Sequence, residues 1–92
     1  MPVTTTSVTL SDTTATLIVG GDNQPHDVTL HNMTKSSNHY VHIGPADMTL
    51  ADSIHIDPGA TIQITLQPND VLYAMSDPDG LEVGVLDIRK ND

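Results

Sequence analysis

The chain of 92 residues contains no cysteine, no tryptophan and no phenylalanine, and only two tyrosines. Without cysteine it can form neither a disulfide nor a thiolate metal site, and its composition fits a reducing compartment. Without large aromatic side chains, the core must be built from Val, Ile, Leu and Met. A domain this small buries only about two-thirds of its unfolded surface, so we expect homo-oligomerisation to add to its stability.

Basic residues are also scarce. Three Lys and Arg stand against twelve Asp and Glu, which gives a formal net charge of −9. Nucleic acids and anionic membranes bind clusters of Lys and Arg, so we expect neither of them as a partner. The acidic excess favours solubility, and a basic protein partner is the alternative interpretation.

Long apolar segments are missing as well. The N-terminal segment MPVTTTSVTL has neither the basic region nor the apolar region of a signal peptide, and no apolar run approaches the roughly 20 residues that span a bilayer. No window shows a helical period of 3.6 residues. We therefore expect synthesis in a cytoplasm and a fold without long helices.

What the chain does contain is a succession of short alternating segments separated by turn residues. They predict an all-β fold, a small antiparallel β-sandwich or barrel of about eight short strands that spans residues 1–92 as one domain. Residues 1–10 are predicted to be extended, either as an edge strand or as an arm that lies on a neighbour. The expected strands are 3–10, 15–19, 26–32, 39–44, 54–56, 62–66, 71–76 and 81–88.

The turn residues allow more specific predictions. Asp57-Pro58-Gly59 predicts a type II turn, because glycine supplies the positive φ, and residues 77–80 (DPDG) predict a type I hairpin turn. The last strand inverts its apolar alternation, which predicts a β-bulge at residues 84–86. A single helical turn is possible at residues 45–50.

Histidines and aspartates are the candidates for chemistry. His31, His42 and His55 could point outward from neighbouring strands, but no spaced ligand motif accompanies them. The metal alternative that we keep open is a ring of one histidine around an oligomer axis. The acids at 47, 52 and 57 surround one loop and are interpreted as solvated rather than as a calcium site.

No catalytic residue set can be assembled. The chain has no cysteine nucleophile and no serine in a nucleophile elbow, so we expect no enzyme activity, no catalytic residue, no metal and no cofactor. Tyr73 shares its side of a strand with Val71 and Met75, which predicts packing. Tyr40 shares its face with His42 and is the better candidate for a surface contact, although two tyrosines are little for a sugar-binding site.

The stretch HYVHIGPADMTLADSIHIDPGATIQITLQPNDVLYAMSDPDGLEVGVLDI resembles small β-rich virion proteins of tailed bacteriophages, of the capsid decoration or head auxiliary type. The resemblance covers a little over half of the chain. Pro45 departs from it where a second glycine is common, and residues 51–53 depart from it where an Asn-Gly turn is usual. The elements that carry it are Ile43-Gly44, Met48-Thr49, Ile54 to Gly59, Ile62 to Leu66 and Asp70 to Ala74.

The resemblance implies a structural protein that binds the outer surface of a bacteriophage capsid and stabilises the shell. The major capsid protein would be its partner and a trimer its favoured oligomer. Its location would be the outer surface of the virion, after synthesis in the host cytoplasm. The alternative is a receptor- or carbohydrate-binding module of a tail fibre or spike. A cellular β-sandwich adaptor is a third interpretation. The residues expected to make the protein contacts are Val3, Thr5, Val8, Leu10, Tyr40, Pro45, Met48 and Asp52.

Overall fold

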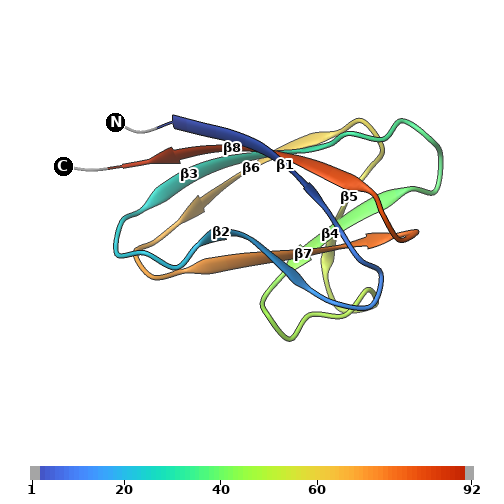
Figure 1. Ribbon diagram of the computed structural model, residues 1–92, viewed down its shortest axis with the longest axis horizontal. Coiled ribbons are helices and arrows are strands. Elements are labelled where there is room, and N and C mark those ends of the chain that lie inside the picture. The colour runs from blue at the N-terminus through green and yellow to red at the C-terminus, as the bar shows by residue number, and fades with distance from the viewer. Residues whose placement is uncertain (1–2, 91–92) are drawn as a thin grey trace.

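The computed structural model describes residues 3–90, and these form eight strands and no helix (Figure 1). The described residues therefore contain no helix that could cross a membrane. The all-β prediction is confirmed. The strands are β1 (Val3–Thr9), β2 (Thr16–Gly20), β3 (His26–Asn32), β4 (Tyr40–Gly44), β5 (Ile54–Ile56), β6 (Thr61–Leu66), β7 (Val71–Asp77) and β8 (Glu82–Arg89).

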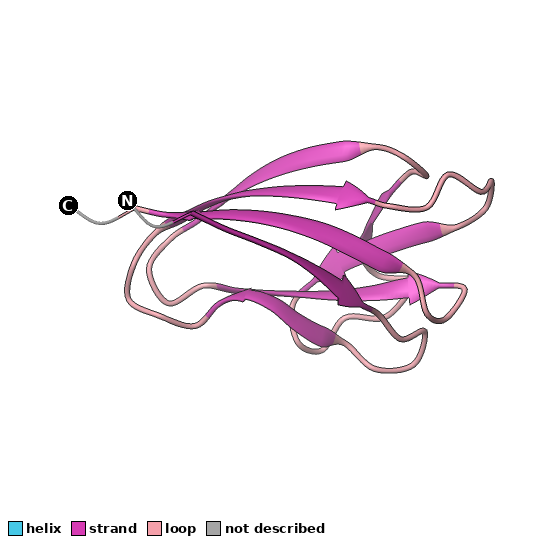
Figure 2. Cartoon of the chain, turned by 45° about the horizontal axis from the view of Figure 1, so that its top comes forward, coloured by secondary structure: helices cyan, strands magenta, loops and turns pink. Residues whose placement is uncertain are grey.

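The strands make two antiparallel sheets that face each other as two layers (Figure 2). One sheet has the order β1-β8-β3-β6 and is called the β1 sheet; the other has the order β2-β7-β4-β5 and is called the β2 sheet. Each of the first four strands pairs with one of the last four in reverse order: β1 with β8, β2 with β7, β3 with β6 and β4 with β5. This winding is that of a jelly-roll sandwich.

The core lies between the sheets and consists of aliphatic side chains, as expected for a chain without Phe or Trp. Along β3, buried and half-buried residues alternate strictly, because successive side chains of a strand point to opposite faces. The inward members Val28 and Leu30 are almost completely buried. They pack in one cluster with inward residues of both sheets: Leu10, Val19, Val41, Ile43, Ile56, Leu66, Leu72, Ala74, Val83 and Val85.

The N-terminal segment is a strand of the β1 sheet. All seven residues of β1 pair with β8, from Val3 opposite Ile88 to Thr9 opposite Glu82. Of the two predicted alternatives, the structure therefore has the edge strand and not the free arm. Residues 1–2 of the predicted 1–10 segment lie outside the described residues.

The predicted bulge in the last strand is wrong. The pairing of β8 with β1 and with β3 runs without a shift through Gly84 and Leu86. The apolar alternation inverts because Leu86 and Ile88 lie on the outer face of the sheet, opposite Thr29 and Asp27 of β3. The register shift that the structure does contain is in β2, between residues 17 and 19.

The turn predictions have mixed outcomes. In the Asp57 turn, the N–H of Ala60 donates to the carbonyl of Asp57 at 3.0 Å and Gly59 has a φ of +74°, as a type II turn requires. Residues 77–80 do not close a hairpin, because β7 and β8 belong to different sheets. Residues 45–48 form a turn closed by Met48 N–H and Pro45 C=O at 3.0 Å, not a helical segment.

Candidate assembly surfaces

The predicted contact residues of the N-terminal segment lie on an exposed sheet edge. Val3 is 60% exposed and Thr5 is also exposed, whereas Val8 is half-buried and packs partly on the core. Leu10 is only 3% exposed and belongs to the core, so its side chain is not available to a partner. The N–H and C=O of Leu10 bond to Leu81 and Gly80, which secures the end of β1.

The second predicted region is the loop between β4 and β5. Pro45 and Asp52 are exposed there, but Met48 is only 7% exposed and lies over Gly44. The side chain of Met48 therefore packs within its own chain, and the prediction that it contacts a partner is wrong. Tyr40, at the start of β4, is half-buried and meets the ring of His55 edge-on, with 5.0 Å between the ring centroids.

The two predicted regions are far apart in the sandwich. β1 ends one sheet on the side where residues 10–15 lead into β2. The loop at 45–53 leads into β5, which ends the other sheet on the opposite side, where residues 57–60 lead into β6. The two regions thus belong to diagonally opposite edges and do not form one continuous patch.

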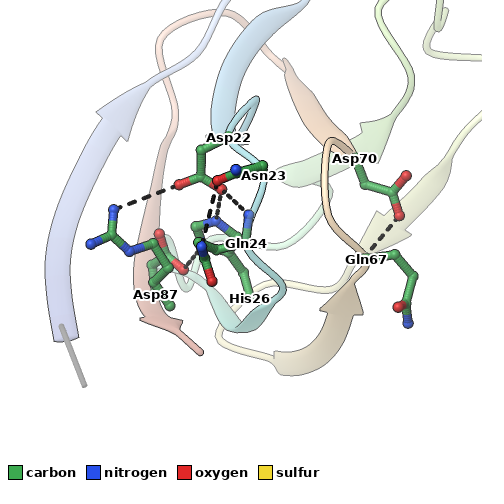
Figure 3. A network of polar contacts seen from close by, with 8 residues as sticks. Asp22, Asn23, Gln24, His26, Gln67, Asp70 and Asp87 are labelled. Atoms are coloured by element: carbon green, nitrogen blue, oxygen red, sulfur yellow. Dashed lines mark hydrogen bonds and ion pairs between the residues drawn. The ribbon is translucent and has the colours of Figure 1, made fainter. Parts of the chain in front are cut away.

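A polar cluster that was not predicted closes one end of the sandwich (Figure 3). His26, at the start of β3, is buried, and both of its ring nitrogens meet carboxylates. Nδ1 lies 2.6 Å from Asp87 Oδ1 on β8, and Nε2 lies 2.8 Å from Asp22 Oδ1 in the β2–β3 loop. Because carboxylates only accept hydrogen bonds, both nitrogens donate, and the imidazolium is the form that satisfies the site.

The ionisation of this cluster follows from its contacts. Burial alone would lower the pKa of His26, but the hydrogen bonds from its ring to Asp22 and Asp87 outweigh burial, and the pKa is raised. The pKa of Asp22 is lowered, mainly by the hydrogen bond from His26 and next by the one from the backbone N–H of Gln24. Arg89 approaches the second oxygen of Asp22 at 3.8 Å.

The same end is held together by backbone bonds between two loops. The N–H of Asn69 donates to the carbonyl of Asp22 at 2.7 Å, and the N–H of Gly21 donates to the carbonyl of Asp70 at 3.2 Å. The Asp70 carboxylate accepts from the N–H of Gln67 at 3.0 Å, which closes the β6–β7 turn (Figure 3). The two ring nitrogens of His26 thus tie the β2–β3 loop to β8, and the backbone bonds tie the same loop to the β6–β7 turn.

Three of the other histidines lie on strands, two in the β2 sheet and one in the β1 sheet, and His39 lies just before β4. His42 and His55 stand directly opposite each other on β4 and β5, with ring centroids 6.0 Å apart, whereas His31 belongs to the β1 sheet. His42 Nδ1 lies 2.9 Å from the hydroxyl of Ser53. Burial, and secondly the charge of His55, lower the pKa of His42. Within residues 3–90, no group of three or more His, Asp or Glu side chains could hold a metal ion.

The sequence did contain a signal for His26. It has the same parity in its strand as Val28 and Leu30, and Asp87 has the same parity in β8 as Val83 and Val85. Alternation therefore places a histidine and an aspartate on the inward side of neighbouring strands. A buried ionisable residue needs a charged or hydrogen-bonding partner. The inward parity of both residues could therefore have predicted that His26 pairs with Asp87.

Neither a protein-family model nor a curated protein matches this chain. Its fold is similar to a solved structure from Bacillus endospore appendages, which are described as a novel family of disulfide-linked pili. That likeness has a TM-score of 0.62 at 12% sequence identity, and it covers 98% of this chain and 87% of the other. At this identity the likeness shows the β-rich fold and nothing further.

Proposed function

We propose that this protein is a structural virion protein that binds the outside of a bacteriophage capsid and reinforces the shell. The observation that carries the proposal is the position of the two contact regions at diagonally opposite edges of the sandwich. A protein that bridges subunits of a lattice needs two separate contact surfaces. β1 would contact a neighbouring copy, and the exposed residues Pro45 and Asp52 would face the shell.

Further support comes from the resemblance of residues 39–88 to virion proteins and from the charge. An acidic chain is repelled by packaged nucleic acid, which suits the outer surface better than the lumen. Binding that favours the mature lattice would stabilise the shell by mass action. The major capsid protein is then the partner, and the protein has no catalytic step to perform.

The test is co-sedimentation of the purified protein with undecorated capsids. We expect the wild type to sediment with capsids at a fixed ratio, and the variant Asp52→Lys to bind more weakly, because it inverts a charge in the exposed loop. Asp12→Lys is the matched control in an exposed turn outside both regions. Absence of capsid binding, together with binding to host cells or glycans, would favour the receptor-binding alternative.

A subunit of a pilus-like fibre is the second candidate. It is favoured by the likeness to the endospore appendage protein, which covers 98% of this chain and 87% of the other. Because this chain contains no cysteine, such a fibre could not be disulfide-linked and would depend on non-covalent contacts. Fibres of the purified protein in electron micrographs, without any affinity for capsids, would favour this candidate.

A further inference from the structure

We infer that copies of this chain associate head to tail, with β6 of one copy pairing antiparallel to β1 of the next, so that the β1 sheet continues from copy to copy in an open row. This inference deepens the proposed function, because it names the strand that β1 contacts. Its test needs no capsid, so it can fail or succeed independently.

The first argument is that both ends of the β1 sheet are unprotected. β1 (VTTTSVT) and β6 (TIQITL) contain no charged residue, no proline and no glycine, and both pair with their neighbours without a bulge. All twelve acidic residues of the chain lie outside these two strands. Natural proteins normally block exposed edge strands with charges, prolines, bulges or short length.

The β2 sheet has those protections. β2 has only five residues, and its register with β7 is irregular. It ends at Gly20, where a φ of +105° ends the extended backbone. β5 has three residues and lies between Asp52 and Asp57. The same chain thus blocks both edges of the β2 sheet and leaves both edges of the β1 sheet open to pairing.

The second argument is the direction of the free backbone groups. The N–H of Leu10 donates to the carbonyl of Leu81 at 2.8 Å, and bonding direction alternates along an antiparallel strand. The odd-numbered residues of β1 therefore direct their N–H and C=O groups to the free edge. On the other side, the N–H of Asn32 donates to the carbonyl of Ala60 at 3.0 Å, so Thr61, Gln63 and Thr65 face the free edge of β6.

The third argument is that the two edges match in direction and in side chains. The four strands alternate in direction, so β6 runs opposite to β1 and a translated copy continues the antiparallel order. On the inner side, the partly exposed Val8 of one copy would cover Ile62 and Ile64 of the other. On the outer side, threonines would meet threonines, a favourable cross-strand pair.

This geometry predicts a row and not the trimer expected from the family resemblance. Neighbouring strands are rotated by about 20 to 25°, and this twist turns each copy about the axis of the row without bending the row back on itself. A contact between two different surfaces that does not close by rotation produces an open assembly. The net charge of −9 opposes it, so association should increase with ionic strength as the Debye length falls from about 30 Å at 0.01 M to about 8 Å at 0.15 M.

The experiment blocks one edge at a time. Thr5→Pro removes an N–H at the free edge of β1, and Gln63→Pro does the same in β6; neither removes a bond within the sheet. The matched controls Thr5→Val and Gln63→Thr keep the N–H. Thr5→Glu and Gln63→Glu add a like charge to each edge and serve if a proline variant fails to fold, which circular dichroism would report.

Analytical ultracentrifugation gives the outcome. We expect the mass of the wild type and of both controls to rise with concentration and salt, and each blocked variant to remain monomeric. An equimolar mixture of Thr5→Pro and Gln63→Pro should form dimers, because one retains β6 and the other retains β1. A wild type that stays monomeric at millimolar concentration in high salt, or that forms a fixed dimer or trimer, overturns the inference. So does a Gln63→Pro variant that dimerises alone, since this would reveal β1–β1 pairing.

Discussion

The two sheets of this sandwich share one core but treat their edges in opposite ways. The β1 sheet ends in long, regular and uncharged strands, whereas the β2 sheet ends in one irregular strand and one of three residues. The ionisable residues differ too: His26 in the β1 sheet is held as an imidazolium between two carboxylates, and His42 in the β2 sheet faces another histidine. In the proposals above, the open edges of the β1 sheet carry the contact between copies, whereas the β2 sheet has blocked edges and carries the loop proposed to face the shell.

The largest expected effect is on the core face of the β1 sheet. Leu30→Ala removes a completely buried side chain and leaves a cavity between the sheets, so we expect a loss of about 2–5 kcal/mol in the free energy of unfolding. Urea denaturation measures it. Leu86→Ala, on the outer face of the same sheet, is the control and should cost clearly less. Equal losses would contradict the assignment of faces on which the edge argument depends.

Asn32 joins the two sheets, and its loss is expected to rank second. Its side-chain N–H groups donate to the carbonyls of His39 and Ile56, both at 3.0 Å, and it is fully buried. Asn32→Ala would leave these carbonyls without their partner, at a cost of about 1–3 kcal/mol. The exposed Asn23→Ala is the control. A neutral Asn32→Ala, measured by the same urea titration, would show that the sheets are held by apolar packing alone.

The sequence predicted the strands well because alternation is a local property. The inward residues of β3 and β6 follow directly from it, and the type II turn at Asp57 follows from another local signal, the Pro58-Gly59 pair. Pairing between distant strands is not local, which is why the turn at residues 77–80 was interpreted as a hairpin although it crosses between sheets.

The candidate surfaces were harder to predict for a related reason. An apolar residue in a strand indicates burial, so Leu86 and Ile88 suggested a bulge, whereas they lie on the outer face. Conversely, Met48 was expected to make a protein contact because it lies in the loop where the family pattern breaks, yet it is buried and covers Gly44. Whether a side chain is free for a partner depends on tertiary neighbours, and a single sequence does not specify them.

The stability contributions of His26 and His42 should depend on pH in opposite directions, which provides a third test of the comparison between the two sheets. The pKa of His26 is raised above its unfolded value of about 6.5, so its stabilisation is complete below that pH and is lost as pH rises through the folded pKa. The pKa of His42 is lowered, so its contribution is present above about 6.5 and is lost as pH falls toward the folded pKa. Urea midpoints measured against pH should therefore show the wild type losing its advantage over His26→Gln at high pH, and over His42→Gln at low pH. Parallel curves for the two variants would contradict the assignment.

The smallest effect concerns the histidine pair of the β2 sheet. The positive charge of His55 lowers the pKa of His42 in addition to burial, so His55→Gln should move the His42 pKa upward but not fully to its ordinary value, because burial remains. Chemical shifts of the imidazole protons, followed by NMR across pH, measure the change at this one ring. His31→Gln removes a histidine from the other sheet and should leave the His42 titration where it was. If His55→Gln had no effect either, burial alone would set the pKa of His42, and the contrast between the two sheets would rest on the edges and on His26.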